Sequence, residues 1–529
     1  MVKKQEWRWV TWVALVLVAA SWLPYTVAWA AAPPGTHFTG LVYNPLDGHT
    51  YIAKMRLGAE GSWLFRLTYT PEPQRGAPIY LFYLLLGHLA RWAGLPLLAV
   101  YHGARTAGGL ALLFGLYRLA ADLADEVRQR RLLFLLAALG AGLGWLAAPL
   151  GRETPDLWVV EVFPFAALLT NAHFPLALAL MVWSAHWGPQ AEKSPRPGLA
   201  LAAGATALGA IQPFGLPPLL GALMGTWVVR GLRRRGVPWR SLSWTALTVL
   251  LALPYPLYTL RVTHSDPVLS AWSAQNVTPS PPLWDWLLGF GLLGPLALAG
   301  AVTAARRGRD GDGLLLGWML ATIVGMALPL DLARRLSLGL GIAVGGLAGL
   351  GWGWLVGAGI GRPQRVVKGR PQRVVKGRPQ RVARTLRRAS VPALVVFSAM
   401  TPLFLLLLGV GAALGEYPLL YLSEGEWTAL AWLRDHVPHD AVVLCAPETG
   451  IFIPAWAGQR VVYGHPFETV DAEERRTQVE RFWAGQRDPA WLDRLDVDYL
   501  LYGPRERVLG GPPLGELLFE AGDTAVYRR

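Results

Sequence analysis

Charge and cysteine are both scarce in this sequence. Only 16% of its 529 residues are charged, and it contains a single cysteine, Cys445. One cysteine excludes an intramolecular disulfide and any cysteine-rich metal site. The motifs GxxxxGK[ST], HExxH and GxSxG, which mark nucleotide phosphate loops, zinc peptidases and serine hydrolases, are also missing. The sequence therefore carries none of these common enzyme signatures.

Apolar residues, in contrast, are abundant. They make up 53% of the chain, and runs of 18 or more recur along it. Each such run is long enough to cross a hydrocarbon core about 30 Å thick. The net charge of +14 could indicate nucleic-acid binding, but the basic residues gather in short segments between apolar runs, as they do in cytoplasmic loops. The pattern predicts a polytopic α-helical membrane protein that contacts membrane lipids and no nucleic acid.

The spacing of the apolar runs predicts about eleven transmembrane helices. Lys3, Lys4 and Arg8 precede the first run and place the N-terminus in the cytoplasm, because lysine and arginine are enriched on that side. The first run is long for a signal peptide, so we expect it to remain as an anchor. The last run, 391–413, leads outward. The chain is therefore expected to be a multi-pass inner- or plasma-membrane protein with residues 414–529 outside.

Three regions follow from this topology. Residues 1–413 form a transmembrane domain, residues 361–390 a basic cytoplasmic loop within it, and residues 414–529 a C-terminal extracytoplasmic domain. The loop repeats the unit GRPQRVVK, in which proline and glycine exclude a stable helix. It is either a solvated segment that fixes orientation and touches anionic lipid, or a partner-binding segment. In the C-terminal region, short buried strands alternate with amphipathic helices, which predicts a small α/β domain.

Polar residues collect at the outer ends of the predicted spans. Residues 33–96 form a large outer loop with two surface helices, near 48–58 and 78–93. Gln212-Pro213 interrupts an apolar run, which predicts two short helices that meet at the outer face. A proton or ion transporter would instead place carboxylates near the midplane. Small-residue spacing in GLGIAVGGLAGLGWGW, from Gly339, predicts close helix packing.

The first outer loop contains the segment NPLDGHTYIAKM, in which Asp47 lies between an Asn-Pro turn and a short amphipathic helix. Aspartate is a preferred N-cap, and a helix from Gly48 to about Gly58 would give Asp47 that role. Alternatively, Asp47 is a base above a lipid-borne substrate, and a positioned base typically contributes about 10²–10⁴-fold. The two roles are compatible.

Three arginines near the outer face require an anion. Arg105 lies about 12 Å into a predicted span, at 1.5 Å per residue. Arg334 and Arg335 form a tight outer pair that runs against the positive-inside bias, and a planar guanidinium suits a lipid phosphate. The alternatives for this pair are snorkelling to ordinary anionic headgroups and ion pairing with Asp331.

At these residues the chain resembles the GT-C superfamily of membrane glycosyltransferases, especially bacterial members related to protein O-mannosyltransferases and aminoarabinose transferases. The resemblance rests on three segments: the acid in NPLDGHTYIAKM, the polar turn, proline and aromatic helix in GSWLFRLTYTPEPQRGAPIYLFYLL, and the arginine with small residues in AVYHGARTAGGLALLFGLYRLA. It follows the chain in order over roughly residues 5–260, and both the broken helix pair and an outer C-terminal domain suit the family. The chain departs from the family in having one aspartate followed by glycine, where an acidic pair is frequent.

The resemblance implies sugar transfer from a polyprenyl-phosphate donor to a glycan, lipid or protein acceptor on the outer face, with Asp47 as general base. It also suggests that Glu72 holds acceptor or metal and that His173 reaches the donor phosphate or sugar. Otherwise, Glu72 lies in a solvated turn and His173 begins an interfacial helix. No metal ligand is assigned, and both metal-free and Mg²⁺- or Mn²⁺-dependent catalysis stay open. A lipid-linked glycan flippase or transporter, and a non-catalytic scaffold with a partner-binding C-terminal domain, are the alternatives.

Overall fold

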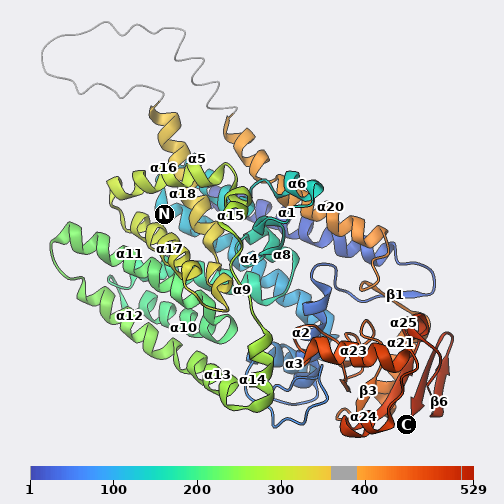
Figure 1. Cartoon of the computed structure of the whole chain (residues 1–529). Coiled ribbons are helices and arrows are strands. Elements are labelled where there is room, and N and C mark those ends of the chain that lie inside the picture. Colours follow the sequence, from blue (N-terminus) through green and yellow to red (C-terminus); the bar gives the residue numbers. More distant parts are fainter. Residues whose placement is uncertain (1, 359–389, 514) are drawn as a thin grey trace, which may run out of the picture.

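The computed structural model describes residues 2–358, 390–513 and 515–529. It consists of a large helical bundle and a smaller lobe that carries a sheet and the C-terminus (Figure 1). The first half of the chain contains α1 (Lys4–Ala30), α2 (Pro45–Ala59), α3 (Leu81–Ala93), α4 (Leu97–Leu123), α5 (Val127–Leu139), α6 (Gly144–Ala147), α7 (Pro155–Trp158), α8 (Pro164–Leu169), α9 (His173–Trp187), α10 (Pro195–Ile211), α11 (Leu216–Arg234), α12 (Trp239–Ala252) and α13 (Pro254–Ser265). The second half contains α14 (Pro267–Gln275), α15 (Leu283–Phe290), α16 (Leu293–Arg307), α17 (Asp310–Ala327), α18 (Leu340–Ala358), α20 (Met400–Leu414), α21 (Glu424–His436), α22 (Ile453–Trp456), α23 (Ala472–Trp483), α24 (Pro489–Arg494) and α25 (Pro504–Leu509). Short 3-10 helices are η1 (Ala148–Leu150), η2 (Gly188–Gln190), η3 (Pro213–Gly215) and η4 (Ala333–Ser337).

The chain is a mostly helical membrane protein. Among the described residues, six helices are long and apolar enough to span a membrane, and a seventh span is counted if the bent pair α15–α16, with an angle of 86°, is taken as one. The expected number of eleven is therefore not confirmed. Several of the remaining predicted spans are shorter helices, such as α9, because Pro and Gly interrupt the apolar runs. The break at Gln212-Pro213 is confirmed, since α10 ends at Ile211 and α11 begins at Leu216.

Glycines allow the helices of the bundle to approach closely. A Cβ added at Gly300 on α16 would lie 1.8 Å from the carbonyl oxygen of Leu347, and one at Gly351 on α18 would lie 2.1 Å from that of Leu296. No larger residue fits at either position without moving backbone. The close packing predicted from the glycine-rich segment of α18 is confirmed.

Both helices expected in the first loop are present, but α2 does not lie on the surface. Ile52 and Met55 of α2 are fully buried. Arg56 Nε and Nη2 donate hydrogen bonds to the carbonyls of Ala455 and Trp456, each at 2.9 Å. The prediction that this helix lies on the surface is wrong for α2, because the C-terminal lobe covers it. The hydropathy of the helix itself does not reveal that a distant part of the chain packs on it. The second helix, α3, does expose apolar side chains, namely Leu85, Leu89 and Trp92.

The C-terminal lobe contains a five-stranded mixed sheet in the order β4-β3-β5-β7-β6. Its strands are β3 (Val442–Leu444), β4 (Arg460–Val461), β5 (Val497–Tyr502), β6 (Glu516–Ala521) and β7 (Thr524–Arg528). The strands β4, β3 and β5 are parallel, whereas β7 pairs antiparallel with β5 and β6. The buried strands predicted at AVVLCAP and VDYLLYG are thus confirmed, and so is the mixture of helices and strands. Cys445, which follows β3, is buried and unpaired.

The C-terminal lobe packs directly against the first loop. The strand β1 (Thr36–Phe38), which follows α1, pairs antiparallel with β2 (Tyr421–Ser423) at the entrance to the lobe. One hydrophobic cluster unites buried residues of α2 and of the lobe, including Ile52, Val443 and Phe452. The lobe therefore shares a core with the first loop. The basic repeat expected over 361–390 lies outside the described residues up to position 389.

Candidate functional site

Asp47 lies in the first turn of α2. The helix begins at Pro45, a residue suited to the first helical position, and the preceding Asn44 has a left-handed backbone with φ +46°. Asn44 Nδ2 donates a hydrogen bond to Asp47 Oδ2 at 2.6 Å. The helix thus starts earlier than Gly48, and the prediction that Asp47 is its N-cap is wrong. The N-terminal turn still favours a carboxylate through its dipole.

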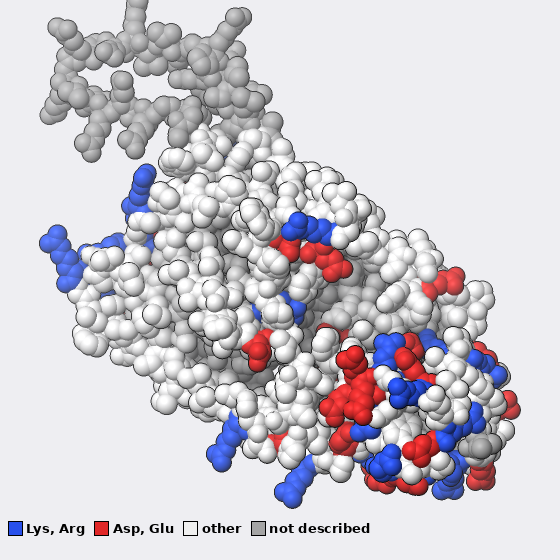
Figure 2. Space-filling view, viewed as in Figure 1, with Lys and Arg blue, Asp and Glu red and all other residues white. Residues whose placement is uncertain are grey.

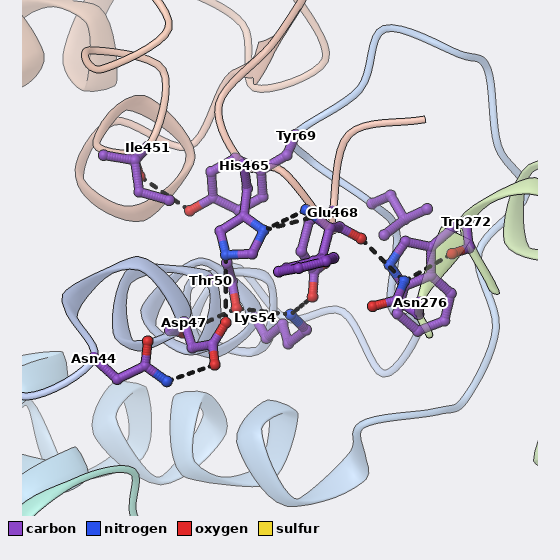
Figure 3. A network of polar contacts seen from close by, with 12 residues as sticks. Asn44, Asp47, Thr50, Lys54, Tyr69, Trp272, Asn276, Ile451, His465 and Glu468 are labelled. Carbon is purple, nitrogen blue, oxygen red and sulfur yellow. Dashed lines mark hydrogen bonds and ion pairs between the residues drawn. The ribbon is translucent and has the colours of Figure 1, made fainter. Parts of the chain in front are cut away.

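A histidine from the C-terminal lobe faces Asp47. His465 Nε2 lies 3.3 Å from Asp47 Oδ1 (Figure 3). The other ring nitrogen, Nδ1, is 3.0 Å from the backbone nitrogen of Phe467 and 3.2 Å from that of Glu468. Both backbone groups donate to Nδ1, so Nδ1 carries no proton and the ring proton is on Nε2. The N–H group of Nε2 therefore lies beside the carboxylate, without a well-aligned hydrogen bond to it.

A buried lysine completes this cluster. Lys54, about two helical turns beyond Asp47, is 2% exposed and its Nζ pairs with Glu468 Oε1 at 2.9 Å. It also donates to Thr50 Oγ1 at 3.2 Å, and Thr50 Oγ1 in turn donates to the carbonyl of Asp47 at 2.9 Å. The ammonium group lies within 5.3 Å of the ring centroids of Tyr51, Phe65 and Tyr80. Since a buried charge needs a partner, Glu468 and the aromatic faces account for Lys54.

These contacts set the charge of Asp47. Burial by itself raises the pKa of the Asp47 carboxyl, but His465, Asn44 and Lys54 outweigh burial and lower the pKa below its usual value. Asp47 is therefore ionised at neutral pH. Its side chain is 42% exposed, whereas that of His465 is 2% exposed. The molecule is hollowed where the helical bundle meets the charged C-terminal lobe (Figure 2). An ionised and accessible carboxylate at this junction can accept a proton from a bound molecule.

The two arginines of the predicted outer pair differ in their partners. Arg334 Nε lies 3.7 Å from Glu161 Oε1, and its guanidinium covers the ring of Trp158. Burial raises the pKa of the Glu161 carboxyl, and the charge of Arg334 opposes that rise. Arg335 covers the ring of Phe214 and forms no ion pair with any acid among the described residues. The alternative that Asp331 pairs with either arginine is wrong for the described residues, since Arg334 lies beside Glu161 and Arg335 covers Phe214.

His173 and Arg105 are buried within the bundle. Tyr83 Oη lies 2.7 Å from His173 Nδ1, and the ring of Tyr51 meets that of His173 edge-on at 5.0 Å. His173 thus contacts the same helix, α2, that carries Asp47. Arg105 Nη1 donates to the carbonyl of Leu169 at 3.0 Å, and its guanidinium covers Tyr25 at 4.2 Å. Its Nη2 is buried with no partner among the described residues, so the anion expected for Arg105 is not supplied by a nearby acid there.

Glu72 has a structural partner in the C-terminal lobe. Its Oε1 accepts a hydrogen bond from Arg475 Nη2 at 2.7 Å, and its Oε2 contacts the hydroxyl of Thr70. Both carboxylate oxygens are engaged by protein groups. Glu72 therefore contributes to the seam between the first loop and the lobe, and it is not an exposed acid in a solvated turn.

The sequence prediction missed His465, Glu468 and Glu161. His465 and Glu468 belong to the segment YGHPFETV, a polar, proline-containing loop that follows the buried strand β4. Polar residues directly after a buried strand are a usable signal, because such loops carry function more often than the strands do. Glu161 lies in a short irregular connection between α7 and α8 and gives no comparable signal.

The residues of this cluster do not fit a divalent metal. No group of three or more His, Cys, Asp or Glu side chains able to hold a metal ion occurs in the described ranges 2–358, 390–513 and 515–529. Asp47 faces the N–H groups of His465 and Asn44, and Glu468 is paired with Lys54. Mg²⁺ prefers several oxygen ligands, and here the oxygens already face donors or a cation.

Solved structures that resemble this chain include an archaeal oligosaccharyltransferase and the bacterial protein ArnT. No protein-family model matches the chain, and no curated protein matches it by sequence. The apo oligosaccharyltransferase from Archaeoglobus fulgidus is similar over 94% of this chain and 69% of its own, with 13% identity and a TM-score of 0.54. ArnT from Cupriavidus metallidurans in the apo state is similar over 98% of both chains, with 15% identity and a TM-score of 0.53. The same ArnT bound to undecaprenyl phosphate gives the same coverage and identity, with a TM-score of 0.50.

The chain therefore has the fold of the GT-C superfamily of membrane glycosyltransferases. The resemblance noted from the sequence is confirmed at the level of fold. The similarity to ArnT extends over 98% of both chains, so it includes the C-terminal lobe as well as the helical bundle.

Proposed function

We propose that the protein is a membrane glycosyltransferase that moves a sugar from a polyprenyl-phosphate donor to a hydroxyl-bearing glycan, lipid or protein acceptor, with Asp47 as general base. The observation that carries the proposal is the state of Asp47: it is ionised, 42% exposed, and held where α2 meets the C-terminal lobe. A hydroxyl is a poor nucleophile until its proton is removed, which is the task of such a base. The binding of undecaprenyl phosphate by ArnT, which has the same fold, supports a polyprenyl-phosphate donor.

The proposed reaction uses groups already described. Asp47 takes the proton of the acceptor hydroxyl while the acceptor oxygen attacks the anomeric carbon of the donor sugar. The bond between the anomeric carbon and the phosphate oxygen breaks, and polyprenyl phosphate leaves with the electron pair. We assign Arg335, which has no ion-pair partner among the described residues, the role of neutralising the departing phosphate, because a guanidinium makes bidentate contacts to phosphate oxygens. No step requires a metal ion.

The test of the base compares two aspartates. Asp47→Asn keeps the size of the side chain, so folding should change little, while release of undecaprenyl phosphate from undecaprenyl-phosphate-linked hexose and pentose donors should fall by about 10² or more. Asp331→Asn is the matched control, since Asp331 is exposed and forms no ion pair with a described residue. Wild-type turnover in the Asp47→Asn protein would reject the base assignment. A flippase or transporter would release no undecaprenyl phosphate from any of these donors.

We also propose that the junction faces the extracytoplasmic side, because the basic residues that precede and divide the spans are expected inside. A reporter enzyme fused after Arg529 should then be active only outside the cytoplasm. A second reporter, inserted within residues 361–388, should be active only in the cytoplasm. Activity of the C-terminal reporter in the cytoplasm would contradict this orientation, and with it the proposed access of Asp47 to an acceptor on the outer face.

A further inference from the structure

The loop from Gly464 to Val470 is held against the helical part from several sides. Glu468 pairs with Lys54 of α2 at 2.9 Å. Thr469 Oγ1 donates to the carbonyl of Tyr69 in the first loop at 2.8 Å. On the side of α14, Gln275 Nε2 donates to the carbonyl of Thr469 at 2.5 Å, and Asn276 Nδ2 donates to that of Phe467 at 3.1 Å.

These contacts come from the first loop and from the end of α14, two parts of the chain that lie far from each other and from this loop in the sequence (Figure 3). Such clamping is unusual for a surface loop, since loops are ordinarily mobile and variable. It indicates that the position of this loop matters to the junction it enters.

The loop has one side chain that reaches Asp47, and its orientation is fixed. The ring of His465 is buried, and Nδ1 accepts from the backbone N–H groups of Phe467 and Glu468. Nε2 consequently carries the proton, and Asp47 Oδ1 at 3.3 Å is the carboxylate oxygen it faces. The Nε2–H group has no well-aligned hydrogen-bond acceptor in the described structure. The Nε2–H group therefore acts on the Asp47 carboxylate as a nearby dipole, and it leaves lone pairs of Asp47 free.

The carboxylate of Asp47 is held from two sides. Asn44 Nδ2 donates to Oδ2 at 2.6 Å, and His465 faces Oδ1. The hydrogen bond from Asn44 holds one oxygen, and the Nε2–H dipole of His465 lies beside the other without a hydrogen bond, so turning the carboxylate plane would weaken one contact or the other. A carboxylate has about four lone-pair sites, so two donors leave capacity for the proton of a substrate. One of the two donors belongs to the first loop and the other to the C-terminal lobe.

We propose that His465 is a positioning residue for the transfer reaction: its Nε2–H group orients the carboxylate of Asp47, so that the C-terminal lobe completes the active site of the helical bundle. This inference rests on the proposed function, because it assigns His465 a part in that reaction. A base displaced by about 1 Å loses on the order of 10²-fold in rate. Loss of the His465 donor is therefore expected to lower kcat and to leave the KM for the lipid donor unchanged.

Two substitutions separate this role from a role in folding the loop. In His465→Gln, the amide nitrogen reaches the place of Nε2 and keeps a donor for Asp47. In His465→Asn, the shorter amide oxygen can still accept from Phe467 and Glu468, but no donor reaches Asp47. We expect His465→Asn to lower kcat about 10–100-fold and His465→Gln to stay within about threefold of wild type. The matched control is His436→Asn, because His436 is an exposed histidine of α21.

The measurement uses the full-length protein in detergent with undecaprenyl-phosphate-linked hexose and pentose donors, and follows undecaprenyl phosphate release. In the Asp47→Asn background, adding His465→Asn should cause no further loss, since there is no base left to orient. An unchanged kcat in His465→Asn, or a larger loss in His465→Gln than in His465→Asn, would overturn the positioning role. If wild-type protein releases nothing from these donors, the proposed function and this inference both fail. If Asp47→Asn is inactive and His465→Asn is not, only the inference fails.

Discussion

The two ends of the helical bundle both contain buried ion pairs, but they use their charged groups differently. At the end remote from the C-terminal lobe, Arg230 of α11 is 5% exposed. Its guanidinium donates to Asp310 at 2.7 Å, to Ser241 at 2.8 Å and to the carbonyl of Pro189 at 2.5 Å. In addition, Glu192 Oε2 lies 3.3 Å from Arg230 Nη1. Every nitrogen of this arginine has a partner.

At the lobe end, the corresponding groups are only partly engaged. Asp47 has one short hydrogen bond, from Asn44, and one longer contact, with His465. Arg335 has no acid partner among the described residues, and Asp47 remains accessible. A fully satisfied network rigidifies a structure, whereas a partly satisfied one keeps capacity for another molecule. The comparison teaches that the remote cluster holds the helices together and that the lobe-end cluster is suited to binding and proton transfer.

The largest expected effect concerns the stability of the remote cluster. Arg230→Ala leaves Asp310 without its hydrogen-bonding arginine, although Glu192 keeps Arg234, and removal of one partner of a buried pair costs about 3–5 kcal/mol. Thermal unfolding in detergent, followed by the fluorescence of the 25 tryptophans, should show the loss. Arg233→Ala is the control, since Arg233 is 63% exposed and 3.7 Å from Asp310, and such a pair is worth about 0–1 kcal/mol. Equal midpoints for the two variants would contradict the structural role of Arg230.

An intermediate effect is expected for the unpaired arginine of the lobe end. Arg335→Ala should raise the KM for the undecaprenyl-phosphate-linked donor about tenfold, because one charged hydrogen bond is worth about 1.5–3 kcal/mol. Arg334→Ala should raise KM less, since Arg334 is occupied by Glu161 and Trp158. Initial rates over a range of donor concentrations measure both. An unchanged KM in the Arg335→Ala protein would assign the phosphate contact elsewhere, with Arg105 and His173 as the next candidates.

The smallest effect is a pH dependence of stability at Asp47. The pKa of this carboxyl is lowered in the folded protein, so ionised Asp47 stabilises the fold above the unfolded pKa of about 3.9. This contribution is lost as pH falls through the lower folded pKa. Because the side chain is 42% exposed, solvent screening should keep it below about 1 kcal/mol. The midpoint temperature of unfolding should be higher for the wild type than for Asp47→Asn above about pH 5, and this difference should narrow below pH 4. A difference that widens in acid would contradict a lowered pKa of Asp47.

Local patterns in the sequence predicted much of the architecture. Gln212-Pro213 marks the break between α10 and α11 because proline removes a helix donor, and the buried strands β3 and β5 follow from short apolar runs bounded by turn residues. The number of spans was less predictable, because proline and glycine divide some apolar runs into helices that are too short to cross a membrane. The start of α2 was misplaced, since a left-handed Asn44 as N-cap is not evident from composition.

The residues of the candidate site also fall into two groups, those that the sequence identified and those that only the structure revealed. Asp47 was identifiable from the sequence, because an acid in a turn before a short helix stands out within an apolar chain, and so were the unusual arginines at 334 and 335. The sequence by itself thus determined that the chain is a helical membrane protein, and it pointed to the carboxylate that we propose as the base. Only the tertiary structure decided what surrounds that carboxylate. Lys54 and Glu468 are 414 residues apart, and His465 reaches Asp47 only because the lobe packs on α2. Contacts at such separations depend on shape and shared burial, which no local pattern records.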